Sequence, residues 1–190
     1  ERESDEKYVI SVPFSKISIK EVTGGLIKGQ NIDNMFNQLT LGYHDSIDFN
    51  ELPIPYACVA EDIVTGKEYD FHQGELATAM RASMAIPGVF TPVRLDSMVL
   101  VDGGTINNFP VNVAKRMGAD IIIGIDVQSN LKPSSELEST GDILGQLINL
   151  MGQDMYEKNL KETDIYIKVN VEGYSAASFT QSAIDTLILR

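Results

Sequence analysis

Ala119-Asp120-Ile121-Ile122-Ile123-Gly124-Ile125-Asp126-Val127 is the stretch of sequence that decides the fold class. Its apolar residues follow one another without a polar alternation, which is typical of a strand that is covered on both faces. Strands of this kind belong to parallel sheets with helices on each side. We therefore predict that residues 119–127 form a central parallel strand.

Helical and extended patterns alternate on both sides of this strand. We predict helices over about 30–40 (with Asn31 able to cap it), 75–84, 110–118 and 140–160 and from about Ser178, and strands over 54–64, 68–71, 99–101 and 164–171. The alternation predicts an α/β fold, a three-layer α/β/α arrangement with a mainly parallel central sheet. Because the 190 residues contain no long linker and no repeat, we expect residues 1–190 to form a single domain.

The charge and composition exclude several classes of function. A net charge of -12 with scattered lysines and arginines argues against a nucleic-acid partner and against electrostatic docking on anionic lipid. No apolar run approaches the ~20 residues that span a bilayer. Cys58 is the only cysteine, so an intramolecular disulfide is impossible, and we interpret it as a core residue. With two histidines and no Cys/His cluster, we do not expect a zinc-type metal site.

Asp102 is the main candidate for a functional residue. The predicted strand Val99-Leu100-Val101 runs directly into Asp102-Gly103-Gly104, and ligand sites of open α/β sheets lie beyond the carboxyl ends of strands. A carboxylate at that place could act as a base or orient one. The alternative is an ordinary turn in which the aspartate accepts a hydrogen bond from a backbone amide.

A serine nucleophile is not evident in the sequence. No Gly-x-Ser-x-Gly elbow occurs, and the nearest pattern, Gly173-Tyr174-Ser175-Ala176-Ala177, is explained equally well by a helix cap at Ser175 or Ser178. No histidine follows His72, so a triad in the order serine, acid, histidine cannot include Asp102; we expect His44 and His72 on the solvated surface. Two carboxylate pairs, Glu61 with Asp62 and Asp102 with Asp126, are further candidates for glycoside hydrolysis or for binding a hard cation.

Three segments taken together resemble the bacterial patatin-like phospholipases. They are residues 79–93 (AMRASMAIPGVFTPV), 100–111 (LVDGGTINNFPV) and 117–127 (MGADIIIGIDV), and residues 26–31 and 52–67 fit the same family. The resemblance extends over most of residues 22–190. Within it, Asn107 and Asn108 are expected to shape the loops around Asp102, whereas Arg81 could either pair with a carboxylate or help to position the cleft.

The resemblance implies a serine acyl hydrolase that cleaves lipid or lysophospholipid esters without a cofactor. In that family a Ser-Asp dyad works without histidine, and Asp102 occupies the aspartate position of its Asp-Gly-Gly motif. Asp102 would accept the serine proton and later activate water on the acyl-enzyme. The family's serine elbow and glycine-rich oxyanion loop lie upstream of everything matched here. We therefore expect this chain to supply only the aspartate and to be inactive alone.

Further expectations concern the setting of the chain. It begins without methionine and ends on an uncapped helical stripe that includes Ile184 and Ile188, so we expect it to be a part of a longer protein. An exposed apolar sheet surface would then favour self-association. The resemblance implies an envelope or secreted location for the parent, with the cytoplasm as the alternative, and peripheral membrane contact. The rival hypotheses are a non-catalytic binding module, a self-contained hydrolase using Ser175, and a cation site at Asp102 and Asp126.

Overall fold

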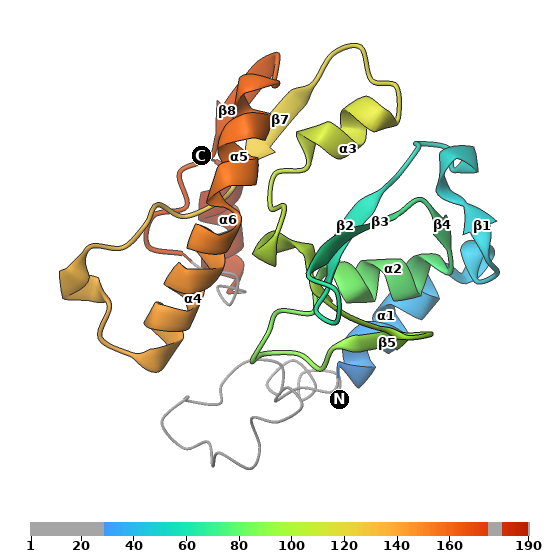
Figure 1. Ribbon diagram of the computed structural model, residues 1–190, viewed down its shortest axis with the longest axis horizontal. Helices are drawn as coiled ribbons and strands as arrows, with labels where there is room; N and C mark the ends of the chain where they lie inside the picture. The colour runs from blue at the N-terminus through green and yellow to red at the C-terminus, as the bar shows by residue number, and fades with distance from the viewer. Residues whose placement is uncertain (1–28, 175–179, 190) are drawn as a thin grey trace.

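The structure, a computed structural model, describes residues 29–174 and 180–189 and contains helices and strands in alternation (Figure 1). The helices are α1 (Gln30–Leu39), α2 (Leu76–Ser83), α3 (Val111–Arg116), α4 (Thr140–Met151), α5 (Gln153–Lys161) and α6 (Gln181–Ile188). The strands are β1 (Ile47–Asp48), β2 (Cys58–Asp62), β3 (Lys67–Phe71), β4 (Gln73–Gly74), β5 (Val93–Leu95), β6 (Met98–Asp102), β7 (Ile123–Asp126) and β8 (Ile165–Lys168). In Figure 1, α1, α2 and β1–β5 lie on one side, and β7, β8 and α4–α6 lie on the other. Helix α3 lies between the two groups.

The largest sheet among the described residues has four strands in the order β3-β2-β6-β5, and every neighbouring pair in it is antiparallel. Within residues 29–174 and 180–189, the one parallel pairing joins β7 to β8, with Ile123 opposite Ile165. The α/β class predicted from the sequence is confirmed. The mainly parallel character is found only in part. Short connections reverse the chain between β2 and β3 and between β5 and β6, which makes these pairs antiparallel, and β6 also pairs antiparallel with the distant strand β2.

The β2–β3 hairpin is closed by Asp62. Its side chain accepts hydrogen bonds from the Val64 amide at 3.2 Å, from the Thr65 hydroxyl at 2.8 Å and from the Val99 amide at 3.1 Å. Gly66 follows with φ +66°, a conformation that glycine adopts without strain. These bonds tie the turn to β6, and the predicted strand over 68–71 pairs with β2 in the hairpin.

Helix α2 packs on the four-stranded sheet through small residues. Ala79 and Ala82 are completely buried, which lets the helix backbone approach the sheet closely. The surrounding core contains Phe49, Cys58, Ala60, Phe71, Leu76 and Leu100. A second cluster, made of Phe109, Val111 and Ile122, joins α3, α5 and β7. The two clusters place the residues after β6 between the two groups of elements.

The described residues cover only one face of strand β7, whereas the sequence predicted that both faces are covered. Ile122 and Asp126 are buried, whereas Ile123 and Ile125 are each 60% exposed. The alternation arises because successive side chains point to opposite faces, and only the face toward α3 and α5 meets other described elements. The continuous apolar run was therefore not sufficient to place helices on both sides. Such an exposed face favours self-association, which stays a prediction.

Two helix boundaries differ from the sequence pattern. The predicted helix over 140–160 is two helices, α4 and α5, which meet at Gly152, a residue that lowers the cost of a break. Helix α1 is preceded by Gly29 in a left-handed conformation without a side-chain cap, so Asn31 lies inside the helix and does not cap it. Among the described residues, none of the helices is long and apolar enough to cross a membrane.

Gly124 gives a first test of this packing. A Cβ atom at this position would collide with the Phe109 ring and lie 2.9 Å from Thr163 Cγ2. We expect Gly124→Ala to lower the free energy of unfolding by about 2 kcal/mol, because the core must move to accept the methyl group. Urea unfolding at 25 °C measures the change.

Gly145→Ala is the matched control for this test. Gly145 lies exposed in α4, and a Cβ there meets nothing within 4 Å. This variant should be more stable by about 0.5–1 kcal/mol, because alanine is the better helix former. Equal effects of the two substitutions would contradict the packing of β7 on Phe109.

Candidate active site

Asp102 is the last residue of β6, at the point where the chain leaves the sheet. Its backbone pairs with Ala60 of β2, and its amide donates to the Ala85 carbonyl at 3.1 Å. The carboxylate therefore starts from a backbone that is fixed on both sides. This is the strand-end position that the sequence predicted.

The turn after Asp102 depends on glycine. A Cβ on Gly103 would collide with the Val59 carbonyl oxygen and lie 2.6 Å from the carbonyl carbon, so only glycine allows the turn to lie against β2. The short 3-10 helix η6 (Gly103–Thr105) follows at once. Within it, the Gly104 amide donates a hydrogen bond of 2.7 Å to Asp102 Oδ1. The turn thus points a backbone donor at the carboxylate.

Burial and this hydrogen bond act on the pKa of Asp102 in opposite directions. Burial raises the pKa because it disfavours the charged form, and the Gly104 amide lowers it because it stabilises the carboxylate. Burial is the larger effect, so the pKa lies above the usual value for aspartate. Such a carboxylate is a stronger base than an exposed aspartate.

The Asp102 carboxyl lines a small open cavity of about 210 Å³. The other lining residues are Ala57, Cys58, Val59, Ser83, Gly103, Gly104, Asn107, Asn108 and Pro110. The cavity is smaller than the ~300–1,000 Å³ of typical ligand sites. To bind a lipid, the cavity would need to be lined by further residues besides these.

The two histidines lie away from this cavity, whereas Cys58 forms part of its wall. His44 is exposed, as predicted, and His72 is half-buried; neither lines the cavity. Cys58 is buried in the core, which confirms the interpretation from the sequence, and burial raises the pKa of its thiol. A thiol with a raised pKa is a poor nucleophile at neutral pH.

Comparisons with known proteins identify the family of the chain. Residues 18–115 match the family described as patatin-like phospholipase, which is more than half of the chain. The chain belongs to the patatin-like phospholipase family. That match includes the Asp-Gly-Gly turn at Asp102.

Individual relatives resemble the chain over a shorter stretch. An uncharacterised NTE family protein of Mycobacterium tuberculosis is 38% identical over 93 residues, which is 48% of this chain and 26% of that protein. A second from the same organism is 32% identical over 109 residues, 57% of this chain and 18% of that protein. Patatin-like phospholipase domain-containing protein 7 of Mus musculus is 34% identical over 111 residues, 57% of this chain and 8% of that protein. The chain thus matches a minor part of the length of these relatives.

The Asp126 carboxylate lies at the end of β7 and is held by hydrogen bonds from neighbouring residues, which indicates a structural role. It is 1% exposed, and its Oδ2 accepts hydrogen bonds from Tyr156 at 2.8 Å, Tyr166 at 2.7 Å and Lys168 at 2.8 Å. The Gln128 amide donates to Oδ1 at 2.8 Å. These partners occupy the oxygens that a cation would need. Within residues 29–174 and 180–189, no group of three or more acidic, histidine or cysteine residues is arranged to hold a metal ion.

The other candidates from the sequence are separated by the structure. Glu61 accepts a hydrogen bond from Thr105, whereas the neighbouring Asp62 closes the hairpin, so the pair does not act on one ligand. Ser175, like Ser178, lies outside the described residues. The Gly-x-Ser alternative is therefore not tested by the structure.

Arg81 pairs with a carboxylate and does not line the cavity. The residue is buried, its Nε lies 3.1 Å from Asp33 Oδ1, and its NH2 group donates to the Thr91 carbonyl at 3.0 Å. The guanidinium also lies 5.2 Å from the centre of the Phe90 ring. Of the two roles considered, pairing with a carboxylate is the one observed, and it joins α2 to α1.

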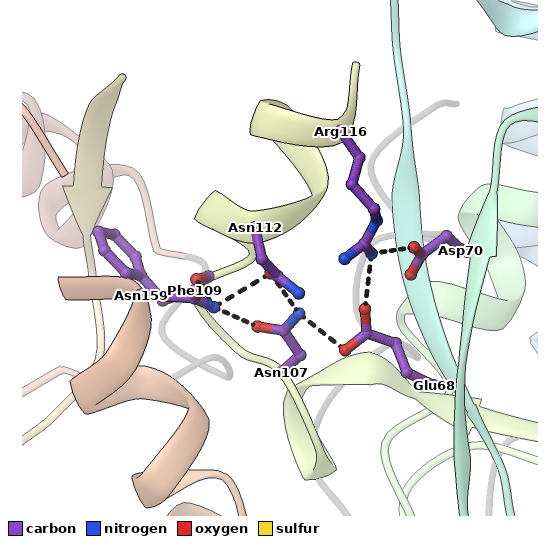
Figure 2. A network of polar contacts seen from close by, with 7 residues as sticks. All are labelled: Glu68, Asp70, Asn107, Phe109, Asn112, Arg116 and Asn159. Carbon is purple, nitrogen blue, oxygen red and sulfur yellow. Dashed lines mark hydrogen bonds and ion pairs between the residues drawn. The ribbon is translucent and has the colours of Figure 1, made fainter. Parts of the chain in front are cut away.

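A polar network beside the site, which is buried at Asn107 and Asn159 and exposed at Arg116, was not predicted from the sequence (Figure 2). It comprises Glu68, Asp70, Asn107, Asn112, Arg116 and Asn159. A signal was present, because Asn112 and Asn159 lie inside helices, where asparagine is unfavourable unless its side chain has partners. That Asn107 shapes the loop after Asp102 was predicted.

Asp126 gives a test of its structural role. Asp126→Asn removes the charge that Lys168 meets, and we expect the free energy of unfolding at pH 7 to fall by about 3 kcal/mol. Burial alone would raise the pKa of Asp126, but the bonds from Lys168, Gln128 and the two tyrosines hold it below its usual value. The stabilisation is therefore present above the unfolded pKa of about 4 and is lost as the pH falls through the lower folded value.

Urea unfolding at pH 7 and pH 3 measures this effect. Asp120→Asn, at an exposed aspartate just before β7, is the control and should change stability by less than about 0.5 kcal/mol. A melting temperature that rises with calcium in the native chain but not in Asp126→Asn would instead support the cation site.

Proposed function

We propose that this chain supplies the general base, Asp102, of a serine acyl hydrolase that cleaves acyl esters of lipids through a Ser-Asp dyad. The observation that supports this most directly is the Asp102 carboxylate itself. It lies at the end of β6, lines an open cavity, accepts the Gly104 amide and has a raised pKa. Membership in the patatin-like phospholipase family supports a lipid substrate.

In this proposal Asp102 moves one proton in each half of the reaction. The carboxylate accepts the serine hydroxyl proton as the serine oxygen attacks the ester carbonyl carbon. Protonated Asp102 then gives the proton to the leaving alkoxide, and an acyl-serine remains. A water molecule gives its proton to Asp102 and attacks the acyl carbon, and the serine oxygen leaves with that proton.

The serine is proposed to come from outside the 190 residues. The printed sequence contains no Gly-x-Ser-x-Gly motif. The isolated chain would then lack both the nucleophile and the amide donors that stabilise the oxyanion, and we expect it to have no hydrolase activity. Residues 1–190 are proposed to belong to a single patatin-like domain.

The partners follow from the same proposal. The substrate is a lipid or lysophospholipid ester, so the working protein makes peripheral contact with a membrane. The net charge of -12 makes nucleic acid an unsuitable partner, because binding phosphates needs clustered positive charge. No cofactor is required by these steps.

A fluorophosphonate probe, read by intact mass, tests the proposal. The 190-residue chain should not react, and a longer form that includes the family's serine elbow should be labelled on serine. In that form Asp102→Asn should slow labelling by at least about 100-fold, because the serine loses its general base. Asp120→Asn is the matched control and should leave the labelling rate unchanged.

Other results would support the rival functions. Labelling of the 190-residue chain at Ser175 would make it a self-contained hydrolase and would overturn the assignment of the nucleophile. If the longer form is folded but does not react, the Asp-Gly-Gly turn is only structural. The chain would then be a binding module.

A further inference from the structure

Asn107 lies shortly after Asp102, and its side chain is anchored by three elements of the structure. Its Nδ2 donates to Glu68 Oε2 of β3 at 2.8 Å and to Asn112 Oδ1 of α3 at 2.9 Å. Its Oδ1 accepts from Asn159 Nδ2 of α5 at 3.0 Å. The Asn107 side chain is 2% exposed, and Figure 2 shows it between the amides of the two helices and the carboxylate of Glu68.

The anchors are themselves held in place. Asn159 is completely buried and also donates to the Phe109 carbonyl at 2.8 Å and to Asn112 Oδ1 at 3.1 Å. On the other side, Arg116 donates to Glu68 Oε1 at 3.1 Å and also contacts Asp70. A buried amide whose partners are fixed in this way has little freedom to change its position.

The backbone of Asn107 closes the turn that follows Asp102. The Asn107 amide donates to the Gly103 carbonyl at 2.7 Å. Gly103 is pressed against β2, and the next residue, Gly104, directs its amide to Asp102 Oδ1. The position of residue 107 and the direction of the Gly104 amide are therefore coupled through one short loop.

We infer that Asn107 is a positioning residue, whose anchored side chain holds the Gly103–Gly104 turn so that the Gly104 amide stays directed at the Asp102 carboxylate. Its catalytic consequence rests on the function proposed above for Asp102. The effect of Asn107 on the turn does not depend on that function, because it involves only the Asp102 carboxylate and the loop beside it.

The hydrogen bond from Gly104 stabilises the ionised form of Asp102, so its loss should raise the pKa further. Other ionisable groups lie on the elements around the turn, and every variant keeps these residues. They include Cys58, Glu61 and Asp62 on β2, Lys67, Glu68, Tyr69 and Asp70 on β3, Arg81 on α2, Arg94 on β5, Lys115 and Arg116 on α3, and Asp142 on α4. Asn107→Ala also removes a hydrogen bond that lowers the pKa of Glu68, so the Glu68 carboxyl is followed in the same titration. Glu61 reaches the turn directly, through its hydrogen bond from Thr105.

The test is a titration of the Asp102 carboxyl carbon by ¹³C NMR on the 190-residue chain. We expect Asn107→Ala to raise the pKa of Asp102 by about one unit. Tyr156→Phe is the control, because it removes a buried hydrogen bond to Asp126 without touching the turn, and it should leave the Asp102 pKa unchanged. An unchanged Asp102 pKa in folded Asn107→Ala would overturn the inference.

A second variant covers the case in which Asn107→Ala does not fold. Asn159→Ala removes the donor to Asn107 Oδ1 together with the hydrogen bonds from Asn159 to the Phe109 carbonyl and to Asn112 Oδ1 of α3. It leaves the Asn107 side chain in place, so it should raise the Asp102 pKa by a smaller amount in the same direction. A loss of stability in Asn159→Ala without any change of this pKa would show that the network is structural only, and the inference would fail.

The longer form separates this inference from the proposed function. There, Asn107→Ala should move the acidic limb of the kcat/KM profile upward by about one pH unit and lower kcat with little change in KM. If the Asp102 pKa shifts in the chain but the activity does not depend on Asp102, the positioning role stands and the proposed general base is wrong.

Discussion

The close contact between Gly103 and Val59 is the constraint on which the site depends. It lets the chain turn immediately after β6 and remain against β2, where any side chain would collide with the Val59 carbonyl. Because Asp102 is paired with Ala60 and held by Ala85, the turn begins from a fixed point and the Gly104 amide reaches the carboxylate. A looser turn would leave the aspartate in the same strand but without its donor.

The buried asparagines connect this turn to the second group of elements. The four-stranded sheet and the β7–β8 pair have separate apolar clusters, and the chain between them passes through residues 103–109. Asn107 and Asn159 bond to each other at this junction. Buried amides cost desolvation unless they are hydrogen-bonded, and among the described residues both Nδ2 groups have partners whereas Asn159 Oδ1 has none. The hydrogen bonds that are made have direction, so they favour one arrangement of the two groups. The junction is therefore specified by geometry as well as by burial.

The sequence predicted the local elements better than their pairing. The hairpin of β2 and β3, helix α2 and the strand before Asp102 follow from apolar periodicity and from glycine and proline positions, which act over a few residues. The antiparallel sheet and the open face of β7 could not be predicted in this way, since both depend on which distant segments meet. Asp102 could be predicted as a site residue because it stands between a predicted strand and two glycines. The network around Asn107 was missed because its members are far apart in sequence, as Glu68 and Asn159 show.

A dyad without histidine makes a particular demand on its aspartate. An aspartate in water is too weak a base to accept a serine proton efficiently, whereas a fully buried one without donors would be protonated at neutral pH and could accept nothing. Asp102 lies between these limits, because burial raises its pKa and the Gly104 amide opposes that rise. A second donor would lower the basicity of the Asp102 carboxylate, and the loss of the Gly104 donor would reduce the fraction of Asp102 that is ionised. The number of amides directed at the carboxylate is thus as important to the proposed chemistry as the carboxylate itself, which is why a glycine turn that supplies one donor suits the role.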